Sequence, residues 1–145
     1  MIIMAHTTVE NIQEIIAMLR EHGKMRFIVP ATEEEISKYE KENGIVLPTQ
    51  YRQWLMFSDG GELFLPASIQ LYGVSHHPVI DVSDDWCPDD KHIVIGSTSW
   101  GDPILCLKNS EVISIFNHDT GCIEDDESWE TFFAFLKDAE HFSDI

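Results

Sequence analysis

Apolar residues recur at three- and four-residue intervals in several stretches of this chain, which is the spacing of one face of an α-helix. The first predicted helix spans residues 8–22, because Thr7 and Glu10 form a capping box at its start and Gly23 offers a stop. Its core-facing stripe consists of Val9, Ile12, Ile16 and Leu19, widened by Ile15.

Two further helices follow in the first half. A second capping box, Thr32 with Glu35, predicts a helix that ends near Gly44, since glycine tolerates the left-handed backbone of a helix end. Pro48 opens the next helix, because its fixed φ and missing N–H suit a first helical turn. That helix ends at Asp59-Gly60-Gly61, and its large apolar residues at helical spacing are Tyr51, Trp54 and Leu55.

Short β-branched and apolar runs, separated by turn residues, predict a set of antiparallel strands. Residues 25–29 are either a short strand or an extended connection. The first two firm strands are compatible with a hairpin. The predicted strands cover residues 62–65, 69–73, 93–96, 103–107, 112–116 and 122–123.

The last predicted helix begins at Trp129, since Trp129, Phe132, Phe133 and Leu136 follow the i, i+3, i+4, i+7 pattern of a core-facing stripe. An acidic run precedes it, and negative charge favours the positive end of a helix dipole. This run consists of Glu124, Asp125, Asp126 and Glu127.

Helices first, then short strands, then a closing helix predict a single α+β domain over residues 1–145. We expect a mostly antiparallel sheet of about five to six strands, packed by the N-terminal helices and the C-terminal helix. At 145 residues the chain is long enough to bury a substantial core without disulfides or metal.

Residues 74–91 have no helical period and contain two prolines and five aspartates, which predicts a long surface loop. Loops of that length inside compact domains are usually functional or mobile. Trp86 lies within this loop, where an aromatic residue amid charge is either an interface contact or a cover for the sheet edge. For Trp100, beside Gly101, we favour the core.

Negative charge dominates the composition, with 26 acidic and 9 basic residues and a formal net charge of −17 at pH 7. Residues 1–61 hold 9 acidic and 6 basic residues, whereas residues 62–145 hold 17 acidic residues and 3 lysines. Such a surface repels phosphate groups, so nucleic acid and anionic membranes are poor partners. A basic protein is attracted to it, although high net charge is also an ordinary route to solubility.

The N-terminus lacks a basic lead with a signal-length apolar segment, and no apolar run approaches the roughly 20 residues of a membrane span. The sequence therefore predicts a cytosolic protein. The three cysteines, Cys87, Cys106 and Cys122, have no C-x-x-C spacing, which favours buried reduced thiols over a disulfide framework or zinc ribbon.

No catalytic or metal-binding motif is recognisable, so the sequence predicts a non-enzymatic protein without a cofactor. For His118-Asp119 a turn is favoured over half of a catalytic dyad, because His-Asp-Thr-Gly is typical of a turn. The aspartates of the loop lack the pattern of a calcium site. A small hydrolase or metal-dependent enzyme is therefore the least favoured of the functions that we consider. A metal set of His76, His77, Cys87 and His92 matches no ligand spacing.

The order of these motifs resembles the SUKH superfamily over about residues 30–138. This family includes the fungal cell-wall assembly regulators of the Smi/Knr type. The segments that carry the resemblance are residues 33–36, 40–44 and 47–55, the turn 59–61, residues 71–73, 95–96 and 101–102, and the pattern from Ser128 to Leu136.

The resemblance implies an α+β fold and binding rather than catalysis. Bacterial members are largely immunity proteins that neutralise toxins, often nucleases, and fungal members act as regulatory hubs. We therefore expect an immunity protein that binds a basic toxin, with a regulatory scaffold as the alternative. The predicted contact residues are Asp84, Asp85, Trp86, Asp89 and Asp90, and then Glu124, Asp125, Asp126 and Glu127.

Overall fold

The computed structural model describes residues 12–65, 69–76, 80, 91–98, 101–117 and 119–143. For residues 22, 124–127 and 140–143 it describes the backbone alone.

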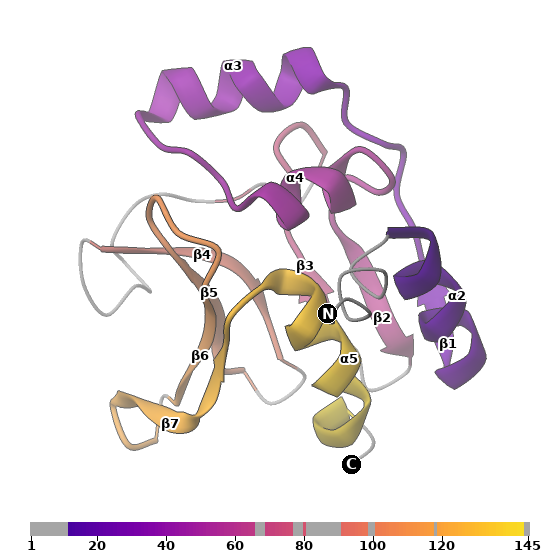
Figure 1. The fold of residues 1–145 in the computed structure, drawn as a ribbon, viewed down its shortest axis with the longest axis vertical. Coiled ribbons are helices and arrows are strands. Elements are labelled where there is room, and N and C mark those ends of the chain that lie inside the picture. The colour runs from indigo at the N-terminus through magenta and orange to yellow at the C-terminus, as the bar shows by residue number, and fades with distance from the viewer. Residues whose placement is uncertain are drawn as a thin grey trace, which may run out of the picture.

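The described strands form one antiparallel sheet in which each strand pairs with its neighbours in the chain (Figure 1). The predicted α+β class with a mostly antiparallel sheet is confirmed. The sheet has one strand more than the expected five to six, because the short segment after the first helix also pairs. The seven strands are β1 (Lys24–Arg26), β2 (Gly61–Leu65), β3 (Ile69–Leu71), β4 (His92–Ser97), β5 (Pro103–Leu107), β6 (Ile113–Asn117) and β7 (Cys122–Trp129).

Helices lie towards both ends of the chain, as predicted, although β1 stands between α2 and α3. In Figure 1, α5 crosses in front of the curved sheet, α2 lies beside β1, and α4 lies between α3 and the sheet. The described part of the first helix ends at His22, as expected, and its predicted start lies outside the described residues. The four described helices are α2 (Ile12–His22), α3 (Glu33–Asn43), α4 (Thr49–Leu55) and α5 (Phe132–Ser143).

Local capping signals explain where α3 begins and ends. The Thr32 hydroxyl accepts from the N–H of Glu35, and the Glu35 carboxylate accepts from the N–H of Thr32. Gly44 follows the helix in the left-handed region at φ 64°. Both predictions are confirmed, and Pro48 stands directly before α4 as expected.

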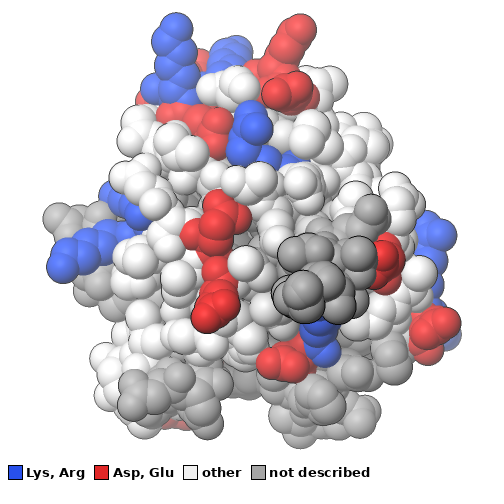
Figure 2. All heavy atoms as spheres, in the orientation of Figure 1, with Lys and Arg blue, Asp and Glu red and all other residues white. Residues whose placement is uncertain are grey.

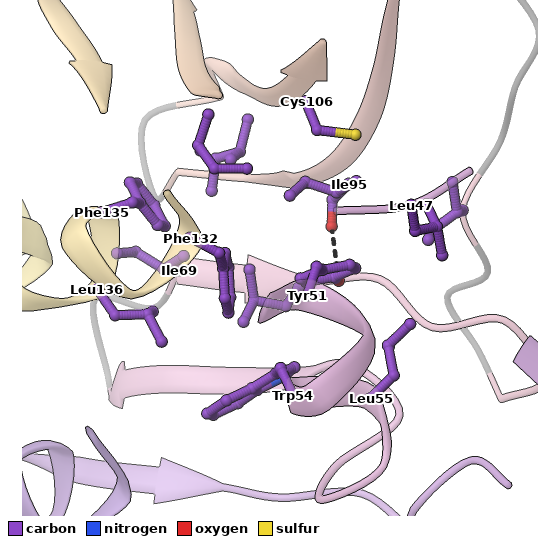
Figure 3. Packing of buried hydrophobic residues seen from close by; sticks show 14 of the residues in the cluster. Leu47, Tyr51, Trp54, Leu55, Ile69, Ile95, Cys106, Phe132, Phe135 and Leu136 are labelled. Atoms are coloured by element: carbon purple, nitrogen blue, oxygen red, sulfur yellow. Dashed lines mark hydrogen bonds between the residues drawn. The ribbon is translucent and has the colours of Figure 1, made fainter. Parts of the chain in front are cut away.

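The core joins α4 and α5 to one face of the sheet (Figure 3). Tyr51 and Trp54 of α4 are fully buried, and both rings pack edge-on against Phe132 of α5. The Trp54 indole donates to the carbonyl oxygen of Gly60 at 3.0 Å, so its one polar atom is satisfied. The aromatic cluster predicted from spacing is therefore the centre of the fold.

Trp129 corrects one prediction, because it ends β7 and does not begin the last helix. It pairs with Ile113 of β6, while its ring packs against Phe135 at a centroid distance of 5.1 Å. Its indole N–H donates to Asp138 at 2.8 Å. The side chain thus contacts the helix from the neighbouring strand, which reproduces a helical spacing without a helical backbone.

The acidic run is also misplaced in the prediction. Residues 124–127 lie within β7, and the first turn of α5 contains no acidic residue. The prediction that this run stabilises the last helix through its dipole is therefore wrong. The strand is also longer than the predicted residues 122–123, because its far end pairs with β6 as well.

Candidate functional site

Of the predicted loop, residues 74–91, the structure describes 74–76, 80 and 91, and the residues predicted to bind a partner lie outside the described residues. This applies to Asp84, Asp85, Trp86, Asp89 and Asp90, and their role stays a prediction. The structure does describe the two points between which that stretch runs, Ile80 and Lys91. Ile80 is buried and donates its N–H to the carbonyl of Gly73, and Lys91 accepts from the N–H of Lys108 after β5.

A buried carboxylate holds the chain where it leaves β3. Asp59 is fully buried, and its oxygens accept from the backbone N–H groups of Val74, Ser75 and His76 at 2.7, 3.0 and 2.8 Å. The His76 imidazole adds a contact from Nδ1 to Asp59 Oδ2 at 2.8 Å. We call these four residues the Asp59 cluster. Hydrogen bonds to a charged acceptor are stronger than those between neutral groups. The cluster therefore fixes residues 74–76 against the turn that follows α4.

Three glycines make room for this cluster. Gly60 and Gly61 have φ of 101° and 129°, which L side chains rarely adopt. At Gly73, a Cβ atom would lie 2.4 Å from an Asp59 carboxylate oxygen. The pair Gly60-Gly61, predicted as a turn, is therefore a turn that also brings Asp59 against residues 73–76.

Helix α3 holds the same segment from its other side. The Ser75 hydroxyl donates to the Glu35 carboxylate at 2.8 Å, and the Tyr39 hydroxyl donates to the carbonyl of Ile80. The Thr32 N–H and then the Ser75 hydroxyl, both donors to Glu35, hold the pKa of this carboxyl below its usual value. Residues 74–76 and Ile80, which lie in the first part of the predicted loop, thus have partners on α3 and at Asp59 after α4.

The second predicted contact region forms a bulge on a sheet edge. Phe116 of β6 pairs with Ile123, and Ser114 pairs with Ser128, so the single residue Ile115 faces four residues of β7. Those four are Glu124, Asp125, Asp126 and Glu127. Among the described strands β7 pairs with β6 alone. Charge and bulges at an edge strand disfavour pairing with another sheet, which gives this run a structural explanation, and its contact with a partner stays a prediction.

The structure brings together no metal set from the residues that it describes. His76 belongs to the Asp59 cluster, whereas His92 begins β4. Cys106 is buried, as expected for a reduced thiol, and Cys122 is exposed, which that prediction missed. The remaining candidates weighed from the sequence, His77, Cys87, Trp100 and His118, lie outside the described residues.

The Asp59 cluster is the feature that sequence reasoning missed. The sequence signal was an aspartate before two glycines, together with Gly73 and the adjacent His76-His77 pair. Nothing in the local spacing connects Asp59 to residues 15 to 17 positions later, because the contact depends on the β2–β3 hairpin.

Charge is unevenly shared between the described residues and the rest. All nine lysines and arginines lie in the described part, whereas seven of the 26 acidic residues lie outside it. On the face shown in Figure 2, side chains of both signs are interspersed. The predicted loop, residues 74–91, therefore adds five aspartates and a single lysine, Lys91.

In a comparison with protein families, residues 30–138 match the model described as SMI1 / KNR4 family (SUKH-1). A comparison with curated proteins gives no match. Among the described residues, none of the helices combines the length and the apolar character that crossing a membrane requires. Since the matched segment covers well over half of the chain, with α3, α4, the described strands other than β1 and the first part of α5, the chain belongs to the SMI1/KNR4 family (SUKH-1).

Proposed function

We propose that this chain is a cytosolic immunity protein, a non-enzymatic domain that binds and neutralises one cognate toxin. The family supports this, because its bacterial members are typically immunity proteins. The observation that carries the proposal is the combination of family membership with the concentration of negative charge after residue 61.

The proposed partner surface is the acidic loop, with the acidic bulge of β7 as its second part. Asp84, Asp85, Trp86, Asp89 and Asp90 are the first contacts that we propose, followed by residues 124–127. The Asp59 cluster supports this choice, since it fixes the first residues of the loop and so lowers the entropic cost of presenting the aspartates that follow.

We infer that the toxin is basic around its active site and acts on nucleic acid. Proteins that bind phosphate backbones carry clustered lysines and arginines, and an acidic partner is steered to such a surface and covers it. The negative loop provides this complementarity, because its five aspartates outnumber its one cation, Lys91.

Growth protection tests the proposal. Co-expression of the chain with the toxin encoded nearest to its gene should restore growth, whereas the double variant Asp84→Lys with Asp85→Lys should protect poorly. The matched control is Glu14→Lys with Glu21→Lys on α2, because both residues are exposed and the change in net charge is the same. Equal protection by the two double variants would refute the acidic loop as the contact surface.

A regulatory scaffold is the second candidate, because the same family includes the fungal cell-wall assembly regulators. In that role the acidic surface binds a cellular protein instead of a toxin. Gene neighbourhood discriminates the two, since a large secreted toxin gene beside this one favours immunity. Absence of protection against any toxin encoded nearby would count against the immunity proposal.

A further inference from the structure

The two ring nitrogens of His76 lie in different environments. Nδ1 lies 2.8 Å from a carboxylate oxygen of Asp59, whose side chain has no exposed surface, whereas the His76 side chain is 38% exposed. The exposed part is therefore the edge of the ring away from Nδ1, which carries Nε2. Among the described residues, Nε2 has no hydrogen-bond partner. One nitrogen is thus held inside the protein while the other faces outward.

The contact with Asp59 determines which nitrogen carries the proton in the neutral ring. An ionised carboxylate only accepts hydrogen bonds, and Asp59 accepts from three backbone N–H groups besides the ring. Nδ1 therefore donates its N–H, which leaves Nε2 with a lone pair and makes it an acceptor. Hydrogen bonds in a chain polarise one another, so the bond to the carboxylate makes Nε2 a better acceptor.

Holding the chain against Asp59 does not require this ring contact. The backbone N–H groups of Val74, Ser75 and His76 already fix the same three residues. The ring is a fourth donor, and what it adds is a fixed orientation and a fixed tautomer of the imidazole. Proteins use a carboxylate in this way to orient a histidine that binds through its other nitrogen. An exposed acceptor alone is ordinarily hydrated, so it is the orientation of the ring that points to a ligand.

The charges around His76 favour a positively charged donor. The Glu35 carboxylate lies beside this residue, since it accepts from the hydroxyl of the adjacent Ser75 at 2.8 Å. Asp59 adds a second negative charge behind the ring. The aspartates that we propose as contacts follow in the same loop. Charge complementarity therefore favours a lysine ammonium or an arginine guanidinium over a neutral donor.

We propose that His76 is a contact residue for the partner, with Nε2 accepting a hydrogen bond from a lysine or arginine side chain and Asp59 positioning the ring. This adds a residue with a fixed side chain to the proposed contact surface, at the start of the loop. The inference rests on the proposed function for the identity of the partner, a basic toxin. Hydrogen bonds to charged donors are strong, so loss of this one should weaken binding roughly tenfold or more.

A matched pair of variants tests this contact. His76→Asn keeps a donor to Asp59, because the asparagine amide nitrogen takes the place of Nδ1, but it has no atom at the position of Nε2. His92→Asn makes the same change at the start of β4, where the histidine is also half-buried. Thermal midpoints close to the native value show that both variants retain the fold. If His76→Asn lowers the midpoint, the spectra of the native chain described next decide the question.

Toxin binding and the state of the imidazole are both measured. The first probe is the inactivated toxin domain encoded beside the gene, whose Kd is determined by calorimetry. We expect His76→Asn to weaken binding roughly tenfold or more and His92→Asn to leave it unchanged. Long-range ¹H–¹⁵N spectra of the ¹⁵N-labelled native chain at neutral pH should show the proton of His76 on Nδ1. The Nε2 signal should move when the toxin is added, which a purely structural role would not produce.

A second probe, the synthetic peptide acetyl-Arg-Gly-Arg-amide, separates this inference from the proposed function. If the toxin binds the native chain and His76→Asn with the same Kd, or if Nε2 carries the proton in the free chain, the contact is refuted and the immunity function is unaffected. If the toxin does not bind but the peptide moves the Nε2 signal of His76 and not that of His92, the immunity function fails and the acceptor role of His76 stands. If the toxin does not bind and the peptide leaves the His76 signal unmoved, both are overturned.

Discussion

At Asp59 the chain buries a negative charge and surrounds it with donors from residues 74–76. Asp59→Asn replaces one acceptor oxygen by an NH₂ group that faces those N–H groups. We expect a loss of about 3 kcal/mol in the free energy of unfolding, measured by urea denaturation, because several charge-assisted hydrogen bonds are lost together.

The control for this change is Glu42→Gln, which also removes one negative charge, at an exposed site on α3. Its unfolding free energy should stay within about 0.5 kcal/mol of the native value. If Asp59→Asn were equally mild, the Asp59 cluster would not hold residues 74–76 as described.

A second residue-scale prediction concerns the buried hydroxyl of Tyr51. It donates to the carbonyl oxygens of Tyr72 and Ile95, so Tyr51→Phe should cost about 1 kcal/mol at neutral pH. Burial raises the pKa of Tyr51 well above its ordinary value of 10.0. The folded chain therefore resists ionisation that the unfolded chain accepts, and this contribution to stability is complete below pH 10 and lost as the pH rises above it.

The measurement is urea unfolding of both proteins from pH 7 to pH 11. The stability difference between the native chain and Tyr51→Phe should shrink above pH 10, because the variant has no phenol to ionise at this position. Two curves that stay parallel over the whole range would contradict the assigned burial effect.

At the scale of elements, α4 depends on a cap that comes from a distant hairpin. The residue before the helix is Pro48, whose side chain cannot accept a hydrogen bond, and the N–H of Thr49 donates instead to Glu111 at 2.8 Å. Glu111→Ala should lower the unfolding free energy by about 1 kcal/mol, the usual effect of losing a helix cap. The exposed Glu130→Ala serves as the control, and a similar effect of both changes would argue against the cap.

The same elements show what could be predicted from the sequence. The ends of α3 were predictable because Thr32, Glu35 and Gly44 signal them through contacts within one or two turns. The cap of α4 joins residues 62 positions apart, and the strand position of Trp129 depends on pairing with β6. Such contacts form only after the sheet is built, so local spacing does not reveal them.

Some features of the candidate site were predictable from the sequence and others were not. Composition alone predicted an acidic surface after residue 61, and the structure places the run at residues 124–127 on an edge-strand bulge rather than before a helix. The Asp59 cluster was not predicted. Burial of this carboxylate is decided by tertiary packing, which carries no periodic signal.

For the whole molecule, net charge predicts how the partner is found. The formal charge of −17 should accelerate encounter with a basic toxin, and the association rate constant should fall steeply as salt rises. Exposed charges are screened beyond about 8 Å at physiological ionic strength, whereas dissociation responds less. Stopped-flow association at several salt concentrations measures this. A rate constant that does not depend on salt would refute electrostatic steering.

The central claim is that this member of the SMI1/KNR4 family neutralises a toxin by binding it. The most direct measurement combines binding and inhibition, with the purified chain titrated into the active toxin domain encoded nearest to its gene. The account predicts a stoichiometric complex in which toxin activity falls to the background level at one equivalent of the chain. Full toxin activity at saturating concentrations of the chain, for every toxin encoded nearby, would contradict it.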